Sequence, residues 1–509
     1  MPNSIDYLRR QAKQLKRDFA AGDAEALARA KAVFPTVETL KHADALHVIA
    51  RENGHESWPR LKLAIETAAM NRAQREERLR IALYYGQHWV TKALLKEDPD
   101  LGSDNPGLQI ALYDRAAVEK ALAADPASAT RLIGVRSPIL HLAFSRHIHA
   151  VPDRRDDMIA IAEALVRHGA DVNDSCPAEP GSEHRLSALY GALGHADNTA
   201  LAKWLLEHGA DPNDNESLYH STELGHHDGL KLLLKHGADP AGTNALPRAM
   251  DFDDLGAVRL LLAAGADPNE GIATHPSGQP ALTVPALHQA ARRMCSSELA
   301  ELLIAHGADG TLAYQGHTAY ALARMFGNDA VANALESAGQ ATALSRAERL
   351  LADAAAGKVS GRIDPNELTD EARRILGRVI SSSGRLDHVK NLCALGIDPN
   401  WTDEMGMPAI HIAGWEGQAE AVEWLLTFNP DLSRKNDYGG DLLGTIIHGA
   451  EFCPARDTRN HTACAQMVLA EGATLRRSEI ELCGAEGLAE FLAGWAQSHP
   501  AQVVEDRST

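Results

Sequence analysis

His208-Gly209-Ala210-Asp211-Pro212-Asn213 is one copy of a short phrase that the chain repeats. Further copies, each keeping the Gly and the Asp, begin at His168, His236, Ala264, His306 and Leu395. Most copies follow an apolar stretch that carries a pair of leucines or similar residues. The sequence therefore repeats a unit of one helix followed by one turn. Such recurrence predicts an array of stacked repeats, and arrays of this kind usually bind other molecules rather than catalyse reactions.

The length and the composition agree with an array. At 509 residues the chain exceeds what one hydrophobic core supports, whereas a stack can grow because each repeat contacts only its neighbours. Only 5% of the residues are aromatic, which suits thin, closely packed helices better than a sheet-rich core. The sequence therefore predicts an all-α solenoid.

The charge is acidic and unevenly distributed. The formal net charge is −19. Residues 1–78 hold 14 Lys and Arg against 11 Asp and Glu, and the rest of the chain holds 36 against 58. Because a polyanion is repelled by such a surface, we expect no nucleic-acid partner along the array.

The sequence also carries no sign of a membrane span or of export. No window approaches the roughly 18 apolar residues that a span needs, and the N-terminus leads into a polar helix without an apolar signal segment. The six cysteines form no CxxC pair, which fits reduced thiols that pack as small hydrophobes. We expect a cytoplasmic protein.

Residues 1–78 lack the repeated phrase and are predicted to form a small helical domain. Helices are expected over residues 5–22, 24–33, 40–53 and 58–78. The first helix has a basic face formed by Arg9, Arg10, Lys13, Lys16 and Arg17. This face is either simply solvated or available to an anionic partner.

The array is expected to begin at Leu79. The glycines of five consecutive phrases are spaced by 40, 28, 28 and 42 residues, which brackets the roughly 33 residues of one helix-turn-helix unit. The longer gaps indicate insertions, predicted as loops over residues 145–157, 174–186, 270–285 and 451–462. The predicted domains are a helical module at 1–78, repeat blocks at 79–340 and 341–477, and a C-terminal capping helix and tail at 478–509.

The clearest unit spans residues 403–426. It contains a turn, then Pro408-Ala409-Ile410-His411, and later Val422 ahead of Leu425-Leu426. These units resemble ankyrin repeats, and the resemblance covers residues 79–472. It implies an ankyrin-repeat α-solenoid of about ten helix-turn-helix units with short hairpin tips, preceded by the small helical domain. Residues 50–62 look like a helical module that precedes ankyrin repeats in many bacterial proteins.

The repeated residue types have structural explanations. The Gly can take the left-handed position that ends a helix, and the Asp can hydrogen-bond the turned backbone. The histidines that open four of the phrases (His168, His208, His236 and His306) are expected to cap their helices rather than to bind metal. His288 and His411 are expected to hydrogen-bond to a turn.

We expect no catalytic residue, cofactor or metal site. Two clusters resemble zinc ligands, namely His220 with His226 and His227, and Cys453 with His461 and Cys464. Neither has two paired ligand sets at short spacing, so these residues are interpreted as loop or surface residues. The phosphate-binding, nucleophile-elbow and zinc-protease motifs are absent from the sequence.

The resemblance also places a binding surface. In the ankyrin register, the residues at the end of each first helix face a concave groove, and the hairpin tips project beside it. Aromatic residues, Met and Arg are enriched at protein-binding hot spots. The predicted protein-binding residues are Phe252, Arg292, Arg293, Tyr314, Met325, Phe326, Met405, Met407, Trp415, Glu416 and Tyr438. Of these, Met405, Met407 and Trp415 are expected to converge on one segment of the groove.

The sequence thus predicts a monomeric, non-enzymatic scaffold that binds a protein partner through the groove. A second hypothesis is an adaptor whose basic N-terminal helix engages an enzyme or nucleic acid. A third is an enzyme with its site in the loop insertions.

Overall fold

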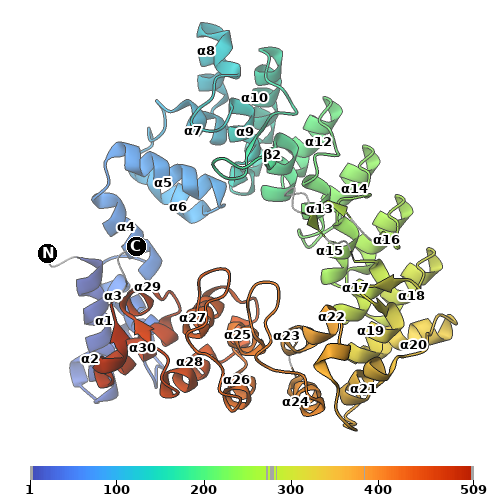
Figure 1. The fold of residues 1–509 in the computed structure, drawn as a ribbon. Coiled ribbons are helices and arrows are strands. Elements are labelled where there is room, and N and C mark those ends of the chain that lie inside the picture. Colours follow the sequence, from blue (N-terminus) through green and yellow to red (C-terminus); the bar gives the residue numbers. More distant parts are fainter. Residues whose placement is uncertain (1–3, 271–272, 275–279, 282–283, 383, 506–509) are drawn as a thin grey trace. The chain divides into compact units, whose positions relative to one another are not determined.

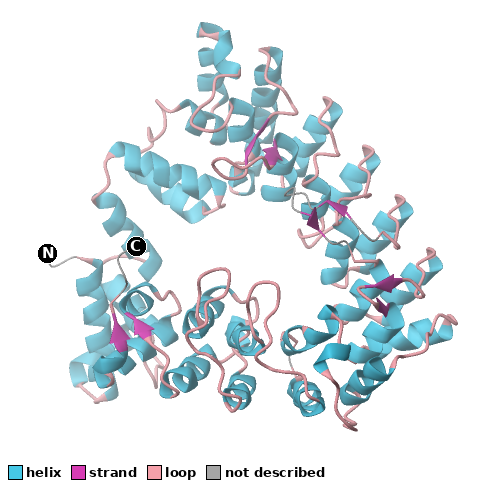
Figure 2. Ribbon diagram, viewed as in Figure 1, coloured by secondary structure: helices cyan, strands magenta, loops and turns pink. Residues whose placement is uncertain are grey.

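The computed structural model describes residues 4–270, 273–274, 280–281, 284–382 and 384–505, and it confirms an all-α repeat fold with a few short strands (Figures 1 and 2). The described residues form two compact units, one made of residues 4–239 and the other of the described residues between 240 and 505.

The N-terminal unit consists of helices joined by turns and short hairpins. Its helices are α1 (Ile5–Ala20), α2 (Ala24–Val33), α3 (His42–Glu52), α4 (Trp58–Ala68), α5 (Arg72–Tyr84), α6 (His88–Glu97), α7 (Pro106–Ala111), α8 (Arg115–Ala124), α9 (Pro138–Ala143), α10 (Arg155–Arg167), α11 (Ala188–Tyr190), α12 (Thr199–Glu207), α13 (Ser217–Ser221) and α14 (Asp228–Lys235). A π-helical turn, η4 (Gly191–His195), extends α11. Strands β1 (Ser175–Pro177) and β2 (Arg185–Ser187) form an antiparallel hairpin.

The C-terminal unit continues the same pattern. Its helices are α15 (Ala245–Asp251), α16 (Leu255–Ala263), α17 (Ala286–Arg292), α18 (Ser297–Ala305), α19 (Ala319–Phe326), α20 (Asp329–Ser337), α21 (Arg346–Ala355), α22 (Asp370–Arg373), α23 (Ile375–Ile380), α24 (Leu386–Leu395), α25 (Ala409–Trp415), α26 (Ala419–Leu426), α27 (Leu442–Phe452), α28 (His461–Ala470), α29 (Arg477–Leu482) and α30 (Glu486–Ser498). Its strands are β3 (Ala273–Thr274), β4 (Pro280–Ala281), β5 (Ala313–Tyr314), β6 (His317–Thr318), β7 (Leu475–Arg476) and β8 (Val503–Val504). β3–β4 and β5–β6 are antiparallel pairs, and β7–β8 is a parallel pair.

The prediction of one helix over residues 58–78 is wrong, because the chain breaks between α4 and α5. Asn71 starts the new helix through a reciprocal pair of hydrogen bonds. Its side chain accepts from the backbone N–H of Gln74, and the Gln74 side chain accepts from the backbone N–H of Asn71, both at 2.9 Å. Helix α5 therefore runs across residue 78, and the boundary placed there between module and array stays a prediction.

The repeated phrase forms the turn that links neighbouring repeats. Gly169 and Gly209 have φ angles of +98° and +94°, which a residue with a side chain rarely adopts. The Asn173 amide donates to the carbonyl oxygen of Gly209 at 3.1 Å, and its side-chain oxygen accepts from the backbone N–H of Asp211 at 2.7 Å. We call this contact the turn bridge. It recurs from Asn269 to Gly307 and Asp309.

The histidines that open the phrases cap their helices, as the sequence predicts. In each case Nδ1 donates to the carbonyl oxygen four residues earlier, at 2.7–2.9 Å. The residues are His168, His208, His236 and His306. Each carbonyl also accepts from the backbone N–H of the same histidine, so the side-chain bond reinforces the last helical turn.

The predicted loop insertions are more structured than expected. Residues 174–186 include most of the β1–β2 hairpin, and residues 145–157 hold two short 3-10 turns and the start of α10. Residues 451–462 begin inside α27 and end inside α28. Of residues 270–285, the segments 271–272, 275–279 and 282–283 lie outside the described residues, as do residues 506–509 of the predicted tail.

The turn bridge can be tested in the N-terminal unit. Replacing Asn173 by Ala removes two hydrogen bonds, so we expect the free energy of unfolding to fall by about 1–2 kcal/mol. Asn173→Asp keeps the acceptor oxygen and loses the donor. Its free energy of unfolding should therefore lie between those of the wild type and Asn173→Ala. Urea denaturation followed by circular dichroism measures the difference. Equal midpoints for wild type and Asn173→Ala would contradict a stabilising role.

Candidate protein-binding groove

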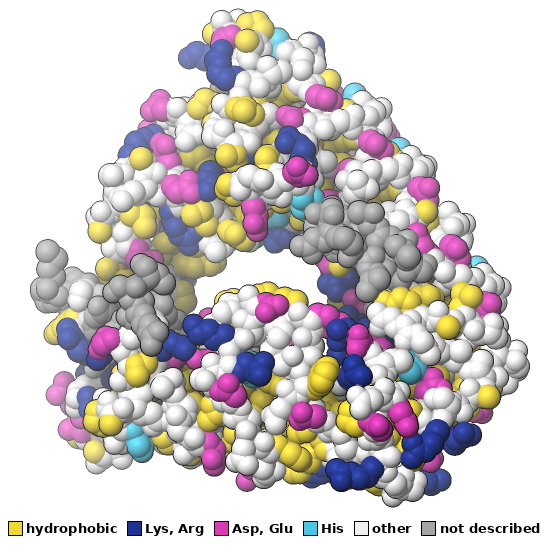
Figure 3. Space-filling view, in the orientation of Figure 1, with side chains coloured by type: hydrophobic (Ala, Val, Ile, Leu, Met, Phe, Trp, Pro, Cys, Tyr) yellow, Lys and Arg dark blue, Asp and Glu magenta, His cyan; other side chains and the backbone are white. Residues whose placement is uncertain are grey.

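A groove of about 550 Å³ lies beside α25 and α27 in the C-terminal unit. It is lined by Met407, Ile412, Trp415, Asn436, Tyr438, Gly440, Gly444, Thr445 and His448, and we call it the C-terminal groove. In the view of Figure 3, the surface over these helices shows a few hydrophobic side chains among polar, charged and backbone groups. The structure therefore brings together three predicted residues, Met407, Trp415 and Tyr438.

Two loops precede α25 and α27 (Figure 1). They contribute Met407, Asn436, Tyr438 and Gly440 to the lining of the groove. The Asp403 carboxylate shapes the first loop by accepting from the backbone N–H groups of Met405 and Met407, both at 2.9 Å. The backbone N–H of Asp437 then donates to the Met405 carbonyl oxygen at 3.0 Å and joins the two loops. Met405 is thus a structural neighbour of the groove and not part of its lining.

Asn436 fixes the second loop from inside. Its side-chain oxygen accepts from the backbone N–H groups of Tyr438 at 3.1 Å and Gly440 at 3.0 Å. Its amide nitrogen donates to Oγ1 of Thr445, 3.3 Å away on α27. Because the buried amide holds this turn in place, the Tyr438 side chain is held out with 76% of its surface exposed.

Trp415 lines the groove at the end of α25. Its ring centroid lies 5.1 Å from that of His448, which in turn lies 4.6 Å from Phe452. The Trp415 carbonyl oxygen accepts from Nε2 of His461 at 2.9 Å. Helix α27 can approach this closely because Gly449 has no side chain, and a Cβ there would lie 2.8 Å from the Trp415 Cα.

Glu416 adds an acidic group next to Trp415. Burial raises the pKa of its carboxyl group above the usual range. Cys453 Sγ lies 3.7 Å from its Oε2 atom and donates a weak hydrogen bond. The carboxylate is half-buried and does not line the groove.

A second set of predicted residues lies near α15 and α17. Phe252 is exposed, with the Arg248 guanidinium 4.8 Å from its ring centroid. Arg293 is exposed as well and pairs with Asp251 at 2.8 Å. Tyr314 is half-buried on strand β5. These residues remain at the surface but do not join the C-terminal groove.

Three predicted surface residues are buried instead. Met325 and Phe326 are 0% and 2% exposed, because α19 packs between α17 and α21 and turns both side chains into the core. Arg292 is also mostly buried, with its Nε 3.1 Å from the carboxylate of the fully buried Glu371. This guanidinium serves an internal ion pair, so the prediction of an open position is wrong for all three.

The first of the two clusters that resemble zinc ligands has other bonding partners. His220 pairs with Glu216 at 3.0 Å and with Glu223 at 2.8 Å, and these carboxylates raise the pKa of His220 to about 9 although burial opposes them. His226 pairs with Asp197 at 3.0 Å. Among the described residues, no group of three or more His, Cys, Asp or Glu side chains could hold a metal ion.

Part of the chain matches a known repeat family. Residues 189–272, which include α12–α16, match the family model of ankyrin repeats in 3 copies. Together with the recurring turn and helix pairs, this match shows that the chain contains ankyrin repeats. Among curated proteins, none matches the chain. The resemblance of residues 50–62 to a bacterial module stays a prediction.

Ankyrin repeats generally mediate protein–protein interactions and are typically non-enzymatic. Among the helices that the structure describes, none combines the length and apolar character that a membrane span needs.

The close approach at Gly449 predicts a strong effect of a single methyl group. Gly449→Ala should lower the free energy of unfolding by about 1–3 kcal/mol, because the new Cβ overlaps the Trp415 backbone. Gly494→Ala on α30 is the matched control, since nothing lies within 4 Å of a Cβ there. Because Ala is more favourable than Gly inside a helix, Gly494→Ala should raise the free energy of unfolding by about 0.5–1 kcal/mol. Thermal unfolding of both variants measures the contrast, and equal effects would contradict the packing argument.

The stability of the groove should depend on pH through His411. Burial lowers the pKa of this imidazole to about 4 from an ordinary value of 6.5. Its Nδ1 lies 3.4 Å from Thr445 Oγ1, and its buried Nε2 has no hydrogen-bond partner. The unfolded chain therefore takes up the proton first, so stability is full above pH 6.5 and is lost as pH falls toward 4.

His411→Leu removes this proton and tests the dependence. Between pH 6.5 and pH 4, the free energy of unfolding of the wild type should fall by up to about 3 kcal/mol relative to that of the variant. Urea denaturation at several pH values measures the loss, and a constant difference between the two proteins would contradict it.

Proposed function

We propose that this protein is a non-enzymatic scaffold that binds an apolar segment of a protein partner in the C-terminal groove. The observation that carries the proposal is the convergence of Met407, Trp415 and Tyr438 on one cavity. Tyr, Trp and Met are residue types that dominate binding energy at protein interfaces. The groove residues come from two neighbouring repeats, as expected of a surface that repeats build together.

The dimensions of the groove support a small anchor. Its volume of about 550 Å³ suits one or a few bulky side chains rather than a whole helix. Its walls are mostly apolar, and the inward polar groups of Asn436 and Thr445 already bond to each other. An apolar anchor would therefore enter without leaving these groups unsatisfied.

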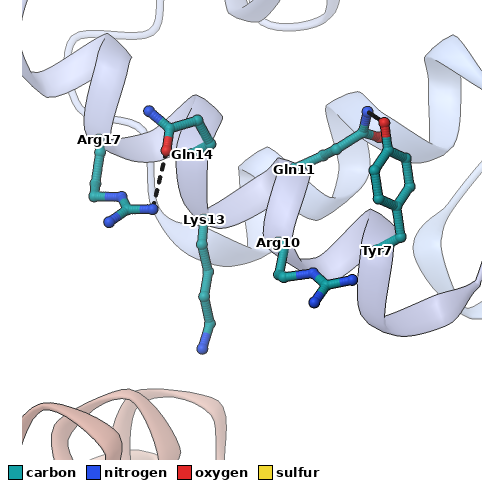
Figure 4. Close-up of a pocket in the computed structure, with 6 residues that line it drawn as sticks. All are labelled: Tyr7, Arg10, Gln11, Lys13, Gln14 and Arg17. Atoms are coloured by element: carbon teal, nitrogen blue, oxygen red, sulfur yellow. Dashed lines mark hydrogen bonds between the residues drawn. The ribbon is translucent and has the colours of Figure 1, made fainter. Parts of the chain in front are cut away.

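A second candidate function rests on α1. The side chains of Arg10, Lys13 and Arg17 point to the same side of this helix, next to Tyr7 (Figure 4). We propose as the alternative an adaptor that engages an anionic surface of another molecule through this basic face, since clustered cations attract such partners.

The state of the cysteines supports a reducing compartment such as the cytoplasm. All six thiols are free, and those of Cys176, Cys295, Cys453 and Cys464 are buried. We propose a monomer for the free protein.

Affinity capture with matched variants tests the proposal. Tyr438→Ala changes an exposed side chain and should leave the fold intact, whereas a hot-spot loss of about 2 kcal/mol weakens binding roughly 30-fold. Trp401→Ala is the control, because this exposed ring contacts Arg373 and does not line the groove. Partners captured by wild type are purified, and their affinities for each variant are measured by calorimetry.

The outcomes separate the two candidates. A partner lost with Tyr438→Ala and kept with Trp401→Ala supports the groove. A partner lost only when Arg10, Lys13 and Arg17 are replaced by Gln supports the adaptor. If no partner distinguishes Tyr438→Ala from Trp401→Ala, the groove proposal is wrong.

A further inference from the structure

A short hairpin in the N-terminal unit exposes aliphatic side chains beside an arginine. The backbone N–H of Ile133 donates to the carbonyl oxygen of Arg136 at 2.8 Å and closes the turn before α9. Leu132 and Val135 on this hairpin are 65% and 74% exposed. Aliphatic side chains held out by an ordered turn lose less entropy on binding than those on a free loop.

The Arg136 guanidinium rests on two aromatic rings. Its Cζ lies 4.7 Å from the centroid of Tyr84 and 4.4 Å from that of Phe144. The two rings are nearly parallel, with centroids 6.1 Å apart and planes inclined by 10°. Tyr84 ends α5 and Phe144 follows α9, so segments far apart in the sequence hold this cation in one place.

The Arg136 guanidinium makes no hydrogen bond or ion pair with the described residues, and its Nε atom is buried without a partner. Other arginines nearby in the sequence are neutralised, since Arg80 pairs with Glu77, Arg131 with Asp125 and Arg154 with Asp157. In a chain of net charge −19, an arginine held on aromatic rings without a carboxylate is an exception.

Arg146 is a second cation near the Tyr84 ring. Nε of Arg146 donates to the backbone carbonyl oxygen of His195 at 2.8 Å, and no carboxylate of the described residues pairs with it. The His195 ring lies 4.1 Å from that of Tyr84. Burial lowers the pKa of His195 to about 4, and the charges of Arg146 and Arg136 contribute. Both guanidinium groups therefore act electrostatically on the same imidazole.

We propose that Tyr84, Leu132, Val135 and Arg136, the Arg136 surface, bind a peptide segment in which a carboxylate lies next to an apolar side chain. The carboxylate accepts hydrogen bonds from Arg136, and the apolar side chain covers Leu132 and Val135. Such a bond would satisfy a guanidinium that the fold leaves without an anion. This surface lies in the N-terminal unit and goes beyond the C-terminal groove, which has no cation in its lining.

A peptide fits this surface better than a nucleic acid does. Leu132 and Val135 offer nothing to a phosphodiester chain, and the Tyr84 ring already packs against the Arg136 guanidinium and the His195 ring instead of stacking on a base. A polyanion would also meet the repulsion of the whole acidic chain, whereas a single carboxylate meets little of it.

Selection from a displayed library of short random peptides tests the proposal on the full-length protein. Peptides that bind wild type are counter-selected on Arg136→Gln, and those lost should be enriched in Asp or Glu next to apolar residues. One enriched peptide, labelled with fluorescein, is then measured by anisotropy. Arg136→Gln should weaken its binding roughly tenfold or more, and added salt should weaken binding to wild type.

Two controls make the result specific. Arg131→Gln removes an exposed cation that is already paired with Asp125, and binding of the peptide should be unchanged. The double variant Leu132→Ser and Val135→Ser alters exposed side chains only and should also weaken binding of the peptide. It therefore tests the proposal even if Arg136→Gln fails to fold.

Three results would overturn the proposal. One is that the peptides lost on Arg136→Gln carry no acidic residue. Another is that binding is indifferent to both the Arg136 and the Leu132–Val135 variants. The third is that a fluorescein-labelled oligothymidylate competes for the surface with higher affinity than the selected peptide, which would assign the site to nucleic acid.

Discussion

The turn bridge is the interaction on which the arrangement of the repeats depends. A helix pair of one repeat cannot bury its apolar face alone, so its neighbour must be held at a fixed distance. The Asn side chain meets this need because one amide both donates to and accepts from the next turn, as Asn173 does with Gly209 and Asp211. Burial of leucines drives the stacking of the repeats. The turn bridge fixes the orientation of one repeat relative to the next, because hydrogen bonds are directional and burial is not.

A related hydrogen bond between neighbouring turns also positions the loops of the C-terminal groove. Asn400 donates to the carbonyl oxygen of Phe428 at 3.3 Å, so the turns before α25 and α27 are held in register. The hairpins that follow those turns can then meet through Asp437 and Met405. Gly449 completes the arrangement by letting α27 approach the Trp415 backbone. The groove is therefore a consequence of how two repeats stack, and not of a special loop.

The two proposed surfaces differ in chemistry. The C-terminal groove is an apolar cavity, whereas the Arg136 surface combines aliphatic side chains with a cation that lacks an anion. A scaffold with two such surfaces can take two different segments, of one partner or of two. Because each surface lies in a separate compact unit, variants in one should leave binding to the other intact.

The sequence by itself determined the repeat fold, the capping histidines and three residues of the groove, because these follow from periodic patterns and local turn chemistry. Only the tertiary structure decided that Met325 and Phe326 are buried, that Arg292 serves Glu371, and that Arg136 rests on Tyr84 and Phe144. The physical reason is that exposure and pairing depend on which neighbouring helix covers a side chain. Such contacts join residues far apart in the chain, where no local pattern records them.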